Sequence, residues 1–144
     1  MADIFSLEPI KMQTLISVRE LRECSDLTAR FGLCLSEEQI QNVVAHRFEA
    51  LKNTGRIEFG EGILKKLVYA FCDSPYITQK NFAETLIDLQ DAFYYFKNQS
   101  ENSITDDELI DYMELAFNEN AQGSTEYLLG TSLEDLCRDT DAGR

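Results

Sequence analysis

Apolar residues recur along this chain at intervals of three and four, which is the spacing of helices that bury one face. The most regular example lies within residues 78–98, where the apolar seam consists of Phe82, Leu86, Leu89, Phe93 and Phe96. The seam is widened on one flank by Ala83, Ile87 and Tyr94. A helix that is apolar over more than half of its circumference is typical of the centre of a bundle. We therefore predict that residues 78–98 form the central helix.

Capping residues mark where the other predicted helices begin and end. Residues 36–39 are Ser-Glu-Glu-Gln, a capping-box pattern that begins a helix over 36–54, and Gly55 closes this helix. A second box at 105–108 begins a helix that extends to about residue 120. Between them a helix is predicted from Gly62 to about Cys72, and Pro75 stops it. Two short helices are expected at 124–129 and 132–138.

The first 35 residues fit two interpretations. Leu15, Val18 and Leu21 fit a helix that begins near Pro9, whereas the β-branched residues within 14–18 fit a strand. We choose the helix. The chain has 144 residues, two prolines and no repeat or linker, so we predict one domain over 1–144 with frayed ends at about 1–8 and 139–144. The predicted fold class is all-α, a single compact helical bundle of five or six helices.

Acidic residues outnumber basic ones by 26 to 13, which gives a net charge of −13. Residues 99–144 hold 12 of the acidic residues and 2 of the basic ones, so most of the excess lies in the last third of the chain. A field of this sign repels phosphate backbones and anionic headgroups, so we expect no nucleic acid and no membrane as partner. It attracts a basic protein surface, although the same charge also keeps a small protein soluble.

Targeting signals are missing from the sequence. The first residues lack the basic start and long apolar stretch of a signal peptide, and no apolar run approaches the roughly 20 residues of a membrane helix. We therefore expect a cytoplasmic protein.

Residues that usually carry catalysis or bind metals are sparse. The four cysteines are Cys24, Cys34, Cys72 and Cys137. They form no C-x-x-C pair and the chain has one histidine, His46, so the usual zinc spacings are excluded. His46 points away from the apolar face of its helix and is predicted to be exposed. We expect free thiols, most of them in the core. Asp73 and a helix C-terminus both oppose a thiolate at Cys72. We therefore predict no catalytic residue, no metal and no cofactor.

Arg47 is anomalous because it falls in the middle of an apolar stripe formed by Ile40, Val44 and Leu51. An unpaired buried guanidinium is costly. Two interpretations stay open: a structural role, in which Arg47 extends to water or pairs with Asp73 or Glu58, and a role in binding an anion.

Two helices carry acidic rows opposite their apolar faces. The row on the central helix comprises Glu84, Asp88, Asp91 and Tyr95, and the row on the helix after residue 105 comprises Asp107, Asp111 and Glu114. An aromatic residue on a charged face is a candidate contact anchor, although charged rows are usually only solvated. The interaction role of this row requires that Tyr95 is not fully buried.

Five stretches of the chain are distinctive as a set: Gly55–Gly60, Phe71–Ile77, Phe93–Asn98, Asp106–Ile110 and Gln122–Leu128. Together they resemble a family of small uncharacterised bacterial proteins, a domain of unknown function found in Gram-positive anaerobes. The resemblance covers about residues 30–130. It implies a bacterial cytoplasmic protein and supplies no activity, cofactor or partner.

These observations lead to a binding or adaptor module with an acidic surface for a basic protein partner, because no acid–base or nucleophile constellation stands out. The alternative is a small-ligand-binding protein or enzyme whose pocket lies near Arg56, Glu58, Asp73 and Tyr76. A structural subunit of a homodimer is a third hypothesis.

Overall fold

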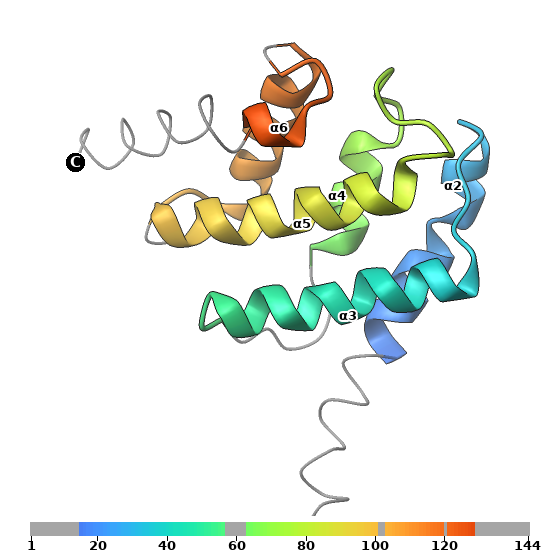
Figure 1. Ribbon diagram of the computed structural model, residues 1–144, viewed down its shortest axis with the longest axis horizontal. Coiled ribbons are helices and arrows are strands. Elements are labelled where there is room, and N and C mark those ends of the chain that lie inside the picture. Colours follow the sequence, from blue (N-terminus) through green and yellow to red (C-terminus); the bar gives the residue numbers. More distant parts are fainter. Residues whose placement is uncertain (1–14, 57–62, 101–102, 120, 129–144) are drawn as a thin grey trace, which may run out of the picture.

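Helix α5 (Phe82–Gln99) occupies the centre of the structure and contacts α3 (Glu37–Asn53), α4 (Leu64–Phe71), α6 (Asp106–Asn118) and α7 (Thr125–Tyr127) (Figure 1). The five residues of its predicted seam are buried. Burial of this continuous apolar surface is the main driving force for packing the bundle. The prediction that this segment forms the central helix is confirmed.

The structure is a computed structural model that describes residues 15–56, 63–100, 103–119 and 121–128. Within these ranges the chain forms helices and no strand, which confirms the predicted all-α bundle. None of the helices in the described ranges combines the length and the apolar character needed to cross a membrane. The predicted helix at 132–138, the ends 1–8 and 139–144, Glu58 and Cys137 lie outside the described residues.

Helix α3 has both of the predicted end signals. Ser36 Oγ accepts from the backbone N–H of Gln39, and the Gln39 side chain accepts from the backbone N–H of Ser36, which completes the capping box. At the other end, Gly55 has a φ of +67°. The N–H groups of Gly55 and Arg56 donate to the carbonyls of Lys52 and Leu51, the pattern of a Schellman motif. Both boundaries therefore match the prediction.

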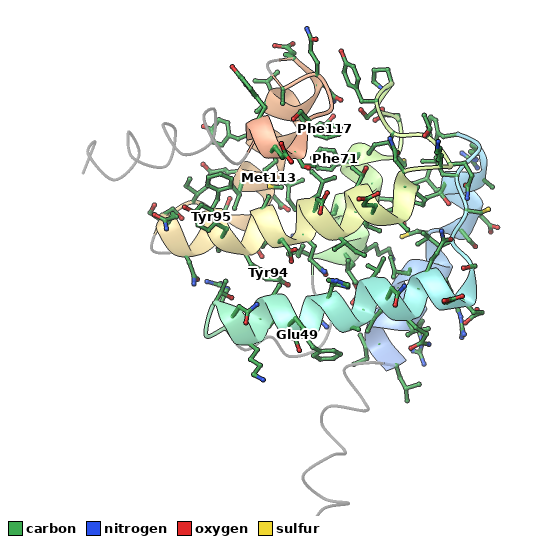
Figure 2. All side chains as sticks on the ribbon, in the orientation of Figure 1. Glu49, Phe71, Tyr94, Tyr95, Met113 and Phe117 are labelled. Atoms are coloured by element: carbon green, nitrogen blue, oxygen red, sulfur yellow. The ribbon has the colours of Figure 1, made fainter. Side chains whose placement is uncertain are left out.

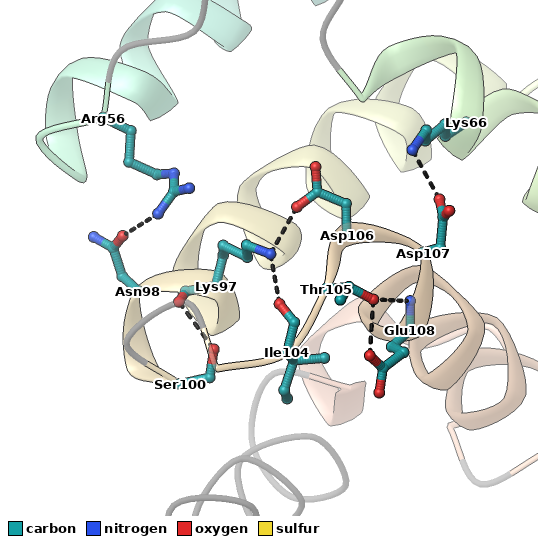
Figure 3. Close-up of polar contacts among 10 residues, drawn as sticks. All are labelled: Arg56, Lys66, Lys97, Asn98, Ser100, Ile104, Thr105, Asp106, Asp107 and Glu108. Atoms are coloured by element: carbon teal, nitrogen blue, oxygen red, sulfur yellow. Dashed lines mark hydrogen bonds and ion pairs between the residues drawn. The ribbon is translucent and has the colours of Figure 1, made fainter.

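Side-chain caps also begin α6 and α7. Thr105 Oγ1 accepts from the N–H of Glu108 at 3.2 Å, and Ser124 accepts from the N–H of Tyr127. The buried Lys97 joins α5 to the start of α6, because its ammonium donates to the carbonyl of Ile104 and lies 2.7 Å from Asp106 Oδ1 (Figure 3). This contact ties the segment before α6 and the first residue of α6 to the end of α5.

The start of α5 differs from the prediction. The helix begins at Phe82, not at residue 78. The amide of Asn81 donates to the carbonyl of Tyr76, and its side-chain oxygen accepts from the N–H of Thr78. These bonds hold residues 76–81 in a turn, because an asparagine side chain competes with the helical backbone for hydrogen bonds. The apolar spacing alone cannot reveal this turn.

The N-terminal part of the described chain is helical. Residues 15–23 form a helix, and α2 (Ser25–Ala29) follows it directly, so the helical interpretation of this segment is confirmed from residue 15 onward. Of the cysteines, Cys24 and Cys72 are buried, Cys34 is exposed, and all three are free thiols. Two of them are core residues, as predicted, and Cys34 is not.

Aromatic side chains fill the junction of α4, α5 and α6. The rings of Phe71 and Phe117 meet edge to face with centroids 5.4 Å apart, and Tyr76 packs on Phe117 in the same manner at 6.4 Å. Figure 2 shows Phe71, Met113 and Phe117 gathered at this junction. Such pairs add a specific geometry to the apolar burial. The outer surfaces of α4 and α6 are thereby fixed relative to each other.

Candidate functional site

The acidic row of α6 lines a shallow groove that separates α6 from α4. Asp107, Asp111 and Glu114 line one side, spanning about 10 Å along the helix. The groove, which we call the α4–α6 groove, has a volume of about 330 Å³. Its other lining residues are Lys66, Tyr69, Ala70 and Ile110. Tyr69 is 50 % exposed, so an aromatic ring stands at the edge of an acidic surface.

Like charges lie close together in this groove. Burial raises the pKa of Glu114 above 4.5, and the neighbouring carboxylates of Asp73 and Asp111 raise it further. Across the groove, Lys66 Nζ lies 2.8 Å from Asp107 Oδ1, and this hydrogen bond raises the pKa of the lysine (Figure 3). One end of the groove is therefore neutralised by an internal cation, while the Glu114 end keeps an excess of negative charge.

A second hollow of about 410 Å³ continues the groove along α6. It shares Asp111 and Glu114 with the first hollow and adds Leu115, Asn118 and Glu119. Leu115 is 57 % exposed. The two carboxylates thus form a ridge between two hollows, and each hollow has an exposed apolar or aromatic side chain beside it. This combination of charge and apolar surface is suited to a side chain that has both an aliphatic stem and a cationic end.

The acidic row of α5 lies against different neighbours. Asp88 is half-buried and accepts a hydrogen bond from Thr125 of α7. Desolvation raises the pKa of Asp88 and Asp91, and His46 of α3 partly offsets both shifts. Tyr95 is 41 % exposed, so the condition set for its interaction role is met (Figure 2). The structure therefore places this row beside α3 and α7, whereas the α6 row faces α4.

Arg47 is fully buried, so the suggestion that it extends to water is wrong. Its Nη1 donates to Ser17 Oγ at 2.6 Å, which links α3 to the helix over residues 15–23. Glu20, one helical turn after Ser17, is also buried. Asp73, one suggested partner, is exposed, and Glu58, the other, lies outside the described residues. The position of Arg47 is that of an interior structural residue.

Among the described residues of the alternative pocket, Arg56 lies far from Tyr76, and Glu58 lies outside the described residues. Arg56 donates to Asn98 near the C-terminal end of α5, while the carbonyl of Tyr76 accepts from Asn81 at its N-terminal end. An 18-residue helix separates these two ends by about 25 Å. Asp73 instead lies near Glu114 and contributes to the electrostatics of the α4–α6 groove.

Sequence reasoning missed the α4 side of the groove. Tyr69 lies between the buried positions Val68 and Phe71, and the stripe of α4 that faces the core excludes it. The signal was present in that pattern, because an aromatic residue off the apolar face must be at least partly exposed. The sequence could not show that α4 packs beside α6, because α5 separates these two helices along the chain.

The surroundings of Cys72 disfavour ionisation of its thiol, as the neighbouring residues in the sequence suggest. Burial raises the pKa of its thiol, and the charge of Asp73 raises it further. Among the described residues, no group of three or more histidine, cysteine, aspartate and glutamate side chains is arranged to hold a metal ion.

The chain belongs to a protein family. Residues 20–144 match the family described as Family of unknown function (DUF6323). The resemblance to a domain of unknown function is thus confirmed at this level. No curated protein and no solved structure matches the chain.

Proposed function

We propose that this member of the DUF6323 family is a non-enzymatic binding or adaptor module that holds a basic segment of a protein partner in the α4–α6 groove. The observation that carries the proposal is that Asp107, Asp111 and Glu114 line one groove. Glu114 is partly desolvated there, and the charges of Asp73 and Asp111 add to the raised pKa of its carboxyl group. A lysine or arginine entering the groove replaces this repulsion by attraction. Binding of a cation thereby relieves the repulsion among these carboxylates, although the partial burial of Glu114 remains.

The groove also matches the rest of a basic side chain. The ring of Tyr69, over which Lys65 Nζ lies 5.8 Å from the centroid, can exchange this internal cation for one from the partner. Tyr69 and the half-buried Ala70 offer apolar surface for the stem of the side chain. The net charge of −13 favours the same partner at long range and disfavours nucleic acid and anionic lipid. A cytoplasmic location in a Gram-positive bacterium, as the resemblance implies, is part of this proposal.

Neutralising Glu114 should stabilise the free protein. Since its pKa is raised in the folded state, the folded protein binds this proton more tightly than the unfolded chain does. The free energy of unfolding therefore falls as the pH rises from 4.5 through the folded pKa, and Glu114→Gln removes that loss. We expect a higher melting temperature for this variant at pH 7 and a gain that disappears towards acidic pH, measured by thermal unfolding in both conditions. Glu49→Gln, on the exposed side of α3, is the control and should change stability little (Figure 2). A less stable Glu114→Gln protein at pH 7 would contradict the argument.

The same charge should matter in the opposite sense for binding. A double variant, Asp111→Asn with Glu114→Gln, should bind a short lysine-rich peptide about tenfold more weakly than the wild type, because two charge-assisted contacts are lost. Titration calorimetry at low and moderate salt measures this change. The matched control is Glu84→Gln with Asp91→Asn, which removes the same charge from α5 and should keep most of the affinity.

Equal losses in the two double variants would show that only net charge matters, and the groove would not be the site. Retained affinity in the α6 variant would also reject it. Affinity capture from the native host, with the α6 variant as the negative bait, then identifies the partner. Light scattering tests the competing hypothesis of a structural homodimer.

A further inference from the structure

A separate cavity of about 210 Å³ is lined by residues of α2 and of the start of α3, together with residues of the preceding helix over 15–23. Its apolar wall is formed by five side chains from separate parts of the chain: Leu21, Leu35, Ile40, Val68 and Phe82. By the volume of liquid water, it has room for about seven groups of the size of a water molecule. We call it the N-terminal cavity. No residue of the α4–α6 groove lines it.

Two opposite charges stand among the residues that line this cavity. The guanidinium of Arg22 binds the carboxylate of Glu37 side by side, with Nε–Oε1 and Nη2–Oε2 distances of 3.2 and 2.7 Å. The two side chains are 57 % and 67 % exposed. An ion pair exposed to this degree contributes little to stability. Breaking this ion pair so that each group can pair with a ligand therefore costs little free energy.

The interior of the cavity is unsuited to charge. Cys24 lines it, and burial raises the pKa of this thiol to about 11, so the sulfur stays neutral at physiological pH. The part of a ligand that enters the cavity must therefore be apolar, while its charged part remains at the exposed pair.

We propose that the N-terminal cavity binds an apolar α-amino acid as a zwitterion, with the carboxylate on Arg22, the ammonium on Glu37 and the side chain between the apolar walls. One ligand of this class supplies both charges, so the guanidinium and the carboxylate exchange their mutual pairing for two new pairings. The cavity is smaller than sites for drug-sized ligands, which suits a side chain of the size of leucine.

Ligands with one charge fit less well. A carboxylate without an ammonium would compete with Glu37 for the same guanidinium and would enter the field of a protein of net charge −13. An amine without a carboxylate would draw Glu37 away and leave Arg22 without a neutralising group. A zwitterion avoids both costs.

The wild-type protein tests this directly in NMR titrations with L-leucine, isocaproate and isopentylamine. The last two ligands keep the same apolar part with only the carboxylate or only the ammonium. We expect saturable shifts of the amides of Cys24 and Thr28 with leucine, and an affinity at least about tenfold above that of either analogue. Absence of saturable shifts with leucine, or equal binding of one analogue, would overturn the proposal.

Variants then assign the two charges. Arg22→Met and Glu37→Gln should each weaken leucine binding about tenfold, while the neighbouring changes Arg19→Met and Glu38→Gln, outside the cavity lining, should leave it unchanged. A site for carboxylates alone would bind leucine more tightly once Glu37 is neutral, so a gain in Glu37→Gln would reject the zwitterion. The amide spectrum of each free variant reports whether it is folded.

Discussion

Replacing Arg47 by alanine should lower the free energy of unfolding by about 3–5 kcal/mol, which is among the largest effects expected for a single residue of this fold. The side chain is fully buried and donates to Ser17 Oγ at 2.6 Å. Alanine leaves a cavity where the long stem packed and removes the donor that satisfies a buried hydroxyl. It also removes positive charge from an interior region that contains the buried carboxylate of Glu20.

Urea unfolding followed by circular dichroism measures this loss. Arg47→Met keeps most of the stem, so it should lose less, about 1–3 kcal/mol. His46→Ala, at the exposed neighbouring position, is the matched control and should stay within about 0.5 kcal/mol of the wild type. If Arg47→Met keeps the stability of the wild type but no longer binds an anion that the wild type binds, the result would instead support the anion-binding hypothesis for this residue.

Arg47 also shows what sequence reasoning can establish about this fold. Its place on the apolar stripe follows from helical spacing, so an unusual interior charge was predictable. Its partner lies 30 residues earlier, on a helix whose packing against α3 has no local signal. By contrast, the capping box at Ser36 and the turn at Gly55 involve only residues that are close in sequence, so local rules predicted both of them correctly.

The candidate site also has features that the sequence predicted and others that depend on contacts between distant segments. Periodicity located the acidic rows of α5 and α6, but it could not indicate which neighbouring helix lies beside each row. Tyr69 lines the groove because α4 packs beside α6. Asp73, which was predicted to line the alternative pocket, instead lies near Glu114. The cavity at Arg22 and Glu37 depends on an approach between residues 15 positions apart, for which the sequence has no pattern.

Four of the five stretches that carry the family resemblance meet in two pairs. Arg56 of Gly55–Gly60 donates to Asn98 of Phe93–Asn98. Gly123 of Gln122–Leu128 lies directly over Tyr76 of Phe71–Ile77. The described residues of these stretches therefore lie at contacts between segments that are distant in sequence, which agrees with a resemblance that names no reaction.

The contact at Gly123 allows a sharp test, because replacing this glycine by alanine should cost about 2–5 kcal/mol. Its φ is +86°, and an added Cβ would lie 2.5 Å from the Cβ of Tyr76, an atom that a rotamer change cannot move away. The variant thus combines backbone strain with an overlap. Gly55→Ala is the control, since its φ is +67° but nothing lies within 4 Å of an added Cβ, so strain alone should cost about 1–2 kcal/mol. Chemical denaturation of both variants gives the difference. Equal losses would mean that the contact between Gly123 and Tyr76 yields without cost, and that the turn over 121–124 does not hold Tyr76 against Phe117.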